Sequence, residues 1–307
     1  MCPQTTPKRK TLIVSHNAGG AAVLAAWVKH QLDPVACDFA LCGPALGIFM
    51  REFPALNLVG LDVNLNSYQQ VIAATSAQDT RWETLFISKA RAAGIFCVSL
   101  LDHWTNYQTR FLLDGKTVYP DEIWVQDDFA YALTTKIAGY PPVEQIEDYY
   151  LCDQAAAIGQ FAAQRDKRDE LHVLVVTEPS TNPLYSEYTV LHDVLCYLDA
   201  HTQQRCHVRL RLHPREEHNK YDAVIENWRQ TLSAEAQNRL QIHLSQDSLI
   251  EDCAWSDWVV GCQTMAMVVA LSAGLKVFSC LPASVSQCAL PHTQIERWFL
   301  PVGASVE

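Results

Sequence analysis

Two short stretches decide how this chain is expected to fold: Leu210–Pro214 (LRLHP) and Asp257–Met265 (DWVVGCQTM). Each reads as a buried strand that ends abruptly. The first stops at a His-Pro step, and the second runs into Gly261, with Gln263 and Thr264 before a helix-like stretch. A glycine at a strand's carboxyl end, followed by small polar residues at a helix N-terminus, presents free backbone N–H groups and the positive end of the helix dipole. Both stretches are therefore suited to holding a phosphate group.

The composition is that of a folded, acidic protein. Its 307 residues suit two domains of about 150 residues each. Hydrophobic residues make up 49% and charged residues 19%, which is a normal globular balance. The formal net charge of −11 argues against binding to nucleic acid, because such binding needs a basic field. An anionic substrate would have to be captured by local dipoles and a few cations.

The sequence shows no sign of export. No apolar run approaches the roughly 18 residues of a membrane span, so we expect no transmembrane segment, with peripheral membrane association left open. The basic N-terminus is followed by Ser15, His16 and Asn17, which interrupt the apolar stretch and make it a poor signal peptide. The eleven cysteines form neither a CxxC pair nor a zinc-site spacing. We expect free thiols in the cytoplasm.

Apolar runs alternate with helix-like stretches in both halves, which predicts parallel βαβ units. In the first half the expected strands are Thr11–Ser15, Asp38–Cys42, Val71–Ala74, Ile95–Leu101 and Glu122–Val125. In the second half they are Leu171–Thr177, Cys206–Leu212, Leu240–Leu244, Asp257–Gly261 and Lys276–Ser279. The expected helices are Gly20–Gln31, Thr80–Ala93, Asp128–Ile137, Tyr188–Ala200, Tyr221–Ser233 and Thr264–Ala273.

This pattern predicts an α/β fold of two facing Rossmann-like domains with a ligand cleft at the carboxyl ends of the strands. The segment Gly139–Pro142 breaks the chain, and the charge run Gln164–Glu170 (QRDKRDE) follows. We therefore expect domains over residues 1–150 and 171–307, joined by a linker over residues 151–170.

The segment Ser15–Gly20 (SHNAGG) follows the first expected strand and precedes a helix. Gly19 and Gly20 would allow close backbone approach of a ligand, and His16 and Asn17 would point into the cleft. The segment is not a GxGxxG fingerprint, so a dinucleotide site is poorly supported. The alternative is a tight turn with a helix-capping Asn17.

The segment Leu100–Phe111 (LLDHWTNYQTRF) places candidate bases at the end of an apolar strand. Asp102 and His103 are adjacent, so their side chains diverge in an extended chain and do not form a dyad. Either could deprotonate an acceptor hydroxyl. Asp102 is the first choice as general base, and His103 and His16 are the alternatives.

The same region offers groups that could bind an acceptor. Trp104 has a flat apolar face for a sugar ring, and Asn106 and Arg110 could bind hydroxyls or a carboxylate. Thr75 and Ser76, at another strand end, could hydrogen-bond a ligand, although such residues also cap helices. The alternative is an irregular loop that its own aromatic residues stabilise.

In the second half, Glu178 could accept hydrogen bonds from a ribose or base edge, and Ser180 and Thr181 could bind phosphate. The intervening Pro179 equally suits an ordinary turn. His213 projects from a rigid strand end, because Pro214 fixes the local backbone.

A donor imidazole at position 213 could stabilise the negative charge that grows on a departing phosphate. No DxD motif stands at a suitable strand end. The pair Asp127-Asp128 begins a helix and is interpreted as its cap. We expect no metal and no cofactor beyond the co-substrate.

The second half resembles the donor-binding domain of GT-B glycosyltransferases. The similarity lies in Val208–Pro214, the short helix Asp247–Cys253, the strand and helix Asp257–Ala273, and Gly274–Val277. The His-Pro step resembles the donor-phosphate motif of bacterial sialyltransferases and capsule enzymes, with Gln263-Thr264 where those families have a Ser/Thr-rich helix start.

The first half, by SHNAGG, TSAQDTRWE and LLDHWTNYQTRF, resembles proteins of bacterial surface-polysaccharide and nonulosonic-acid gene sets.

The resemblance implies a metal-independent glycosyltransferase. It would move a sugar, with a nonulosonic acid from a CMP donor as one candidate, from a nucleotide-activated donor to a glycan, glycolipid or other hydroxyl acceptor. The donor groups would be Glu178, Ser180, Thr181, His213, Pro214, Gly261, Gln263 and Thr264. Two alternatives are a nucleotide-sugar hydrolase or epimerase, and a non-catalytic nucleotide-sugar-binding protein.

Overall fold

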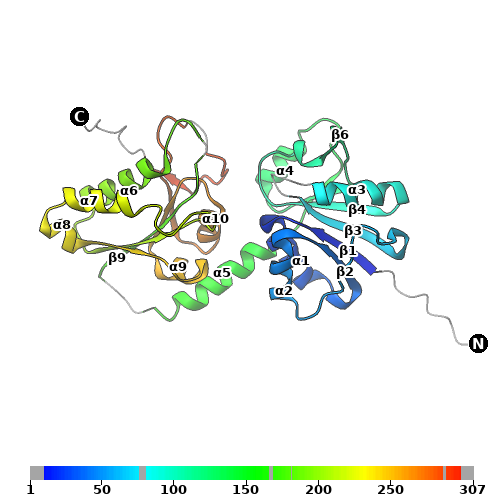
Figure 1. Ribbon diagram of the computed structural model, residues 1–307, viewed down its shortest axis with the longest axis horizontal. Coiled ribbons are helices and arrows are strands. Elements are labelled where there is room, and N and C mark those ends of the chain that lie inside the picture. Colours follow the sequence, from blue (N-terminus) through cyan, green and yellow to red (C-terminus); the bar gives the residue numbers. More distant parts are fainter. Residues whose placement is uncertain (1–9, 76–80, 166–168, 181, 286–287, 299–307) are drawn as a thin grey trace, which may run out of the picture. The chain divides into compact units, whose positions relative to one another are not determined.

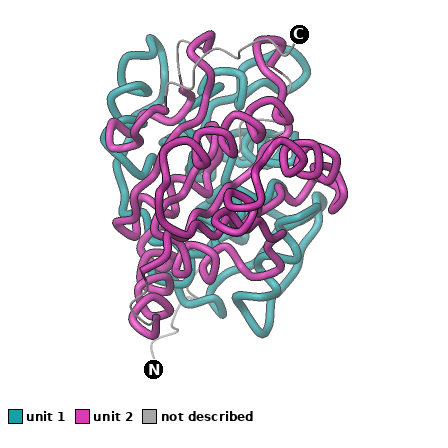
Figure 2. The backbone as a smooth tube through the Cα atoms, turned by 90° about the vertical axis from the view of Figure 1, so that its left-hand side faces the viewer, with its two compact units in different colours: residues 1–150 teal, residues 151–307 magenta. Residues whose placement is uncertain are grey.

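The computed structural model describes residues 10–75, 81–165, 169–180, 182–285 and 288–298. The chain divides into two compact units, Met1–Tyr150 and Leu151–Glu307 (Figure 2). Each unit holds one six-stranded parallel sheet with helices packed against it (Figure 1), which confirms the predicted α/β class. The segment 151–170, expected as a linker, contains most of helix α5 (Tyr149–Ala162).

The sheet of the first unit has the strand order β2-β1-β3-β4-β7-β8. The chain passes from β1 outward to β2 and then returns to β3 on the other side of β1. This reversal makes the β1/β3 boundary the topological switch point, where ligands of doubly wound sheets bind. The strands are β1 (Lys10–Ser15), β2 (Cys37–Leu41), β3 (Tyr68–Thr75), β4 (Phe96–Leu101), β7 (Glu122–Val125) and β8 (Val143–Gln145).

Helices cover both faces of this sheet because side chains of a strand alternate between its faces. On β1, Ile13 packs with α1 (Ala18–Gln31) and α2 (Gly43–Glu52), whereas Leu12 and Val14 pack on the side of α3 (Arg81–Ala93). The remaining elements are the helix α4 (Asp128–Thr134), the antiparallel hairpin β5 (Leu112–Leu113) and β6 (Lys116–Thr117), and three 3-10 turns, Pro34–Ala36, Leu65–Ser67 and Thr109–Phe111.

The sheet of the second unit has the order β11-β10-β9-β12-β13-β14, so its switch point lies between β9 and β12. The strands are β9 (Leu171–Val176), β10 (Cys206–Arg211), β11 (Leu240–Leu244), β12 (Trp258–Gly261), β13 (Lys276–Ser279) and β14 (Glu296–Arg297). The helices are α6 (Glu187–His201), α7 (Asp222–Thr231), α8 (Ala234–Arg239), α9 (Leu249–Trp255) and α10 (Met265–Ser272).

One face of this sheet is apolar, where Val173 and Val208 pack against Val194 of α6 and Trp228 of α7. Among the described residues no helix is long and apolar enough to cross a membrane. The described cysteines are all free thiols, and most are buried as small apolar groups.

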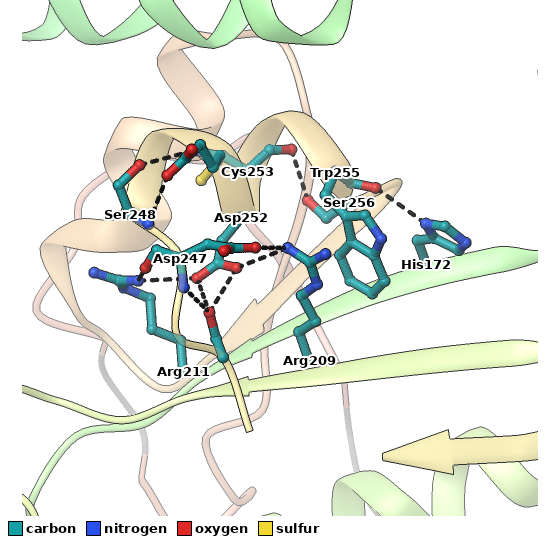
Figure 3. Close-up of polar contacts among 11 residues, drawn as sticks. His172, Arg209, Arg211, Asp247, Ser248, Asp252, Cys253, Trp255 and Ser256 are labelled. Carbon is teal, nitrogen blue, oxygen red and sulfur yellow. Dashed lines mark hydrogen bonds and ion pairs between the residues drawn. The ribbon is translucent and has the colours of Figure 1, made fainter. Parts of the chain in front are cut away.

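The opposite face carries a charged cluster that ties α9 to the sheet (Figure 3). The fully buried carboxylate of Asp252 in α9 accepts hydrogen bonds from Arg209 (3.2 Å), Arg211 (2.9 Å) and the Ser245 hydroxyl. Asp247 also pairs with Arg209, at 2.6 Å, but nearly half of its side chain is exposed. The buried carboxylate of α9, bonded to two guanidinium groups of β10, therefore holds the helix against the sheet.

We expect Asp252→Ala to lower the free energy of unfolding by about 2–4 kcal/mol, because it leaves two arginines without their buried counter-charge. Urea denaturation measures this change. The control is Asp247→Ala, which removes an exposed ion pair of Arg209 and should cost less than about 1 kcal/mol. Equal losses in the two variants would contradict a structural role for the buried carboxylate.

Candidate functional site

The switch point of the second unit brings Glu178 and Gln263 together. Glu178 follows β9 and Gln263 follows β12, and the Gln263 backbone N–H donates to Glu178 Oε2 at 3.2 Å. Gly261 has a packing role here, because an added Cβ would lie 2.7 Å from Val176 Cγ2 and 3.1 Å from the Val176 carbonyl oxygen. The absence of a side chain lets β12 end tightly against β9.

Helix α10 begins directly after these residues. Thr264 is its N-cap residue, and the Thr264 hydroxyl makes no capping hydrogen bond to the helix. The Gln263 side chain is used internally, since its Oε1 accepts the Ala289 N–H at 3.1 Å. The N-terminal N–H groups of α10 and the Thr264 hydroxyl thus remain as the donors at this strand end.

His213 lies on the other side of β9, in the loop after β10. Its backbone N–H donates to Thr177 Oγ1 at 3.1 Å and to Glu216 Oε2 at 3.0 Å. Glu216 also accepts hydrogen bonds from the Lys220 ammonium (2.7 Å), the Tyr221 hydroxyl (2.8 Å) and the Thr177 hydroxyl. Burial alone would raise the pKa of Glu216, but these donors hold it below its usual value. The buried carboxylate therefore fixes the backbone that presents His213.

The imidazole of His213 is set up as a neutral donor. Its Nδ1 accepts the Arg215 backbone N–H at 3.1 Å, so in the neutral ring the proton resides on Nε2. Burial, and then the nearby charge of Arg215, lower the pKa of His213. A neutral Nε2–H group can donate one hydrogen bond to an oxygen on which negative charge develops.

Glu178 is the second perturbed group of this site. Burial raises its pKa from the ordinary 4.5 to about 7, and the Gln263 N–H only partly offsets this effect. Near neutral pH the group therefore exists in both forms, and the protonated form can donate as well as accept.

Ser180 and Pro214, two further predicted donor groups, stand in the loops after β9 and β10. The Ser180 hydroxyl donates to the Tyr185 carbonyl oxygen at 3.4 Å and accepts the Asn182 N–H at 3.2 Å, so it shapes its own turn. Pro214 is exposed. Thr181 lies outside the described residues. The donor-binding roles of Ser180, Thr181 and Pro214 stay predictions.

In the first unit, His16 follows β1 at the switch point. Its backbone N–H donates to Glu83 Oε1 at 2.6 Å, and Glu83, on α3, is fully buried. The ring of His16 packs on Gly43, which has a φ of +53° and where an added Cβ would lie 2.6 Å from His16 Cδ2. The Nδ1 atom of His16 is buried and has no hydrogen-bond partner among the described residues. A ligand group is one means of satisfying such an atom.

Asp102 follows β4, and its carboxylate lies against the first turn of α1. An added Cβ at Gly19 would collide with Asp102 Oδ2, so the glycine permits this approach. Arg110 holds the other oxygen, with Nη1 at 2.7 Å from Asp102 Oδ1, and is itself buried. The guanidinium also donates to three backbone carbonyl oxygens, those of Thr75, His103 and Thr105. Arg110 thus positions Asp102 from inside the unit.

Residues of the segment after β4 also make hydrogen bonds within the first unit. Trp104 Nε1 donates to Asp127 Oδ2 at 2.7 Å. Asp127 Oδ1 caps α4 by accepting the Ala130 N–H at 2.7 Å, which confirms the predicted capping role. Burial lowers the pKa of His103. Asn106 is exposed and has a left-handed φ of 59°.

Thr75, Asn17 and Gly20 also stand where strands of this sheet end, at β3 and β1. The Thr75 hydroxyl is fully buried and lies 3.1 Å from Ser99 Oγ on the neighbouring strand β4. Its hydrogen bond therefore links two strands of the sheet. Asn17 is the N-cap residue of α1, and Gly20 is buried in its first turn. Ser76 lies outside the described residues. The acceptor-binding assignment of all these residues stays a prediction.

The sequence analysis missed the two buried carboxylates that hold the sites, Glu216 and Glu83. Glu216 stands in the run His213–Glu217 (HPREE), where it reads as one of two surface acids. Glu83 reads as a helix-start residue that suits the dipole. In both cases the role depends on a contact with a residue from another part of the fold. Local sequence patterns do not show such contacts.

Comparison with known proteins identifies the fold. Neither a family model nor a curated protein matches this sequence. The structure of Anabaena Alr3699/HepE in complex with UDP matches with a TM-score of 0.59 and 12% identity, over 89% of this chain and 80% of that chain. UDP-GlcNAc 2-epimerase from Methanocaldococcus jannaschii matches at 0.57 and 9% identity, over 88% and 83%. Acinetobacter baumannii MurG matches at 0.53 and 10%, over 88% and 78%. The chain has a GT-B-type fold.

Glu178 should make stability depend on pH. Because its folded pKa is raised to about 7, the proton it keeps stabilises the fold at low pH, and this contribution is lost as pH rises through 7. A difference of one unit between the folded and unfolded pKa corresponds to about 1.4 kcal/mol. The free energy of unfolding of Glu178→Gln, taken relative to that of the native chain, should therefore rise by about 2–3 kcal/mol between pH 5 and pH 8. Urea denaturation at both pH values measures the gain. Glu217→Gln, at an exposed position, is the control. If the free energies of unfolding of Glu178→Gln and the native chain differ by the same amount at both pH values, the interpretation of Glu178 as a buried acid is wrong.

Proposed function

We propose that this chain is a sugar-nucleotide enzyme, most specifically a glycosyltransferase, whose second unit binds the nucleotide donor at its β9/β12 switch point. The observation that carries the proposal is the position of His213, which follows β10 at the same carboxyl edge of the sheet as the N-terminus of α10, with its Nδ1 bonded to the Arg215 N–H. A hydrogen-bond donor and a helix N-terminus together suit a phosphate group. The structural neighbours in complex with UDP or UDP-glucose support this assignment.

The proposed chemistry is stabilisation of a leaving phosphate without a metal ion. As the bond from the sugar to the phosphate breaks, negative charge grows on the phosphate oxygen. His213 would donate its Nε2 proton in a hydrogen bond to that charge, and the α10 N–H groups and Thr264 would donate to the other oxygens. Because His213 is neutral, it contributes a directed hydrogen bond rather than a full positive charge.

In the first unit, Asp102 is the proposed general base for an acceptor hydroxyl. Arg110 holds one carboxylate oxygen and leaves Oδ2 beside the first turn of α1. A base must be held within hydrogen-bond reach of the proton that it removes, and the ion pair supplies this rigidity. His103, beside Asp102, and His16, whose buried Nδ1 has no hydrogen-bond partner among the described residues, are the alternative bases.

The donor is a finer proposal. The structural neighbours in complex with UDP and with UDP-glucose favour a uridine nucleotide. The similarity of the His-Pro step to sialyltransferases favours a CMP-linked nonulosonate. Both donors contain a pyrimidine base and a phosphate group bonded to the sugar. His213 and the N-terminus of α10 would therefore suit either donor.

Epimerisation is the second candidate function. The similarity to UDP-GlcNAc 2-epimerases from Methanocaldococcus jannaschii and, with a TM-score of 0.58 and 8% identity, from Neisseria meningitidis favours it. An epimerase or hydrolase acts on the donor alone. A binding protein would hold the nucleotide and give no product.

A thermal-shift panel of CMP, CDP, UDP, GDP and ADP tests the donor site. We expect a cytidine or uridine nucleotide to raise Tm by several degrees, since a ligand at about 100 times its Kd adds about 2.7 kcal/mol. The nucleotide-induced increment should persist in EDTA. No response to any nucleotide would remove the basis of the donor site.

The role of His213 is tested by His213→Ala, with His218→Ala as a matched control at an exposed position of the same loop. Loss of a donor to a developing charge should lower kcat by about 100-fold or more, whereas His218→Ala should leave kcat unchanged. UDP- and CMP-sugars are incubated with and without hydroxyl acceptors, and products are followed by mass spectrometry and NMR. Product that requires an acceptor supports transfer. Rapid release of the sugar or its 2-epimer without an acceptor would instead establish the alternative function.

A further inference from the structure

The second unit has a pocket of about 540 Å³ on the face of its sheet that α6 and α7 do not cover. Its lining includes Glu170, His172, His207, Arg209, Asp247 and Trp255. The candidate donor groups follow the carboxyl end of β9, whereas Glu170 and His172 stand at its amino end. The six residues of β9 separate its amino and carboxyl ends by about 20 Å. The pocket is therefore not part of the donor site.

Three side chains converge in this pocket. The register pairs His172 of β9 with His207 of β10, so both imidazoles project from the same face. Glu170, directly before β9, reaches His207 Nε2 with its Oε2 at 2.9 Å. One ligand atom from each of the three residues lies within 4.8 Å of the others. Two imidazoles and a carboxylate at this spacing are a common donor set for divalent transition metals.

The surroundings orient these groups as a metal site requires. His172 is buried, its ring stacks on Trp255 at 4.3 Å, and its Nδ1 lies 3.2 Å from the Trp255 carbonyl oxygen (Figure 3). A donor bond from Nδ1–H to that carbonyl places the ring proton on Nδ1 and the lone pair on Nε2, which is the tautomer that binds a metal ion through Nε2. Arg205 bonds the Glu170 carboxylate at 3.3 Å. Such outer contacts, from a backbone carbonyl to the histidine and from a donor to the carboxylate, typically orient metal ligands.

We propose that Glu170, His172 and His207 bind a divalent transition-metal ion of the Zn²⁺ class. With three protein ligands, the fourth position of a tetrahedral site faces the pocket and takes water or a small oxygen ligand. The positive charge of Arg209 does not prevent this, because Arg209 is paired with Asp247 and Asp252 and stacks on Trp255. This inference is independent of the proposed function.

The test uses the untagged full chain, stripped of metal with EDTA and then exchanged into metal-free buffer. Calorimetry with ZnCl₂ should give one site per chain, and Co²⁺ should give the visible absorption of a tetrahedral site. Loss of one ligand should weaken binding by more than the roughly 10–100-fold that loss of an outer-shell contact costs. His207→Ala and Glu170→Gln remove partly exposed ligands, so both variants should fold.

His243→Ala is the matched control, because His243 lines the same pocket but stands outside the three-residue cluster. It should retain native affinity. Absence of saturable Zn²⁺ binding would overturn the proposal, as would affinity that His207→Ala and Glu170→Gln leave unchanged. The nucleotide-induced Tm increment of the stripped protein is measured in parallel, so failure of the donor site and failure of the metal site give different results.

Discussion

The parallel direction of all strands in the two six-stranded sheets is the constraint on which the rest of this molecule depends. Parallel strands bring their carboxyl ends to one edge and their amino ends to the other, so residues far apart in the chain meet there. His213 and Gln263 reach the same edge in this way, on either side of β9. The Glu170–His172–His207 cluster reaches the opposite edge of the same sheet. Two chemically different sites can thus occupy one domain without sharing residues.

Buried carboxylates then fix the loops at these edges. Glu216 accepts hydrogen bonds from Thr177 at the end of β9, from the His213 backbone N–H and from Lys220. Lys220 also donates to Glu187 of α6, at 2.6 Å. Glu83 holds the backbone of His16 in the first unit. Glu216 is stable as a buried charge because its oxygens accept these hydrogen bonds, so displacement of the His213 loop would remove some of the partners of a desolvated carboxylate. Functional loops are therefore positioned by charges that themselves need not touch a ligand.

Sequence periodicity predicted most strands closely, because buried parallel strands are short apolar runs that end in polar or small residues. Leu240–Leu244, Lys276–Ser279 and Glu122–Val125 occur as predicted. Helix α2 was not predicted, because Gly43, Pro44 and Gly47 suggest a loop, although proline suits a first helical turn. Helix α5 was assigned to a linker because of the chain break before it and the charge run after it.

The sequence alone determined which strand ends carry polar groups, since hydrophobic alternation and its interruption are local properties of the chain. It also established the two-half α/β organisation, for the same reason. Only the tertiary structure decided which strand ends are neighbours, because strand order depends on packing between distant segments. It turned Arg110 inward to hold Asp102 and gave Gly261 a packing role beside Val176. It also joined Glu170, His172 and His207, whose positions form no recognisable motif until β9 and β10 are paired.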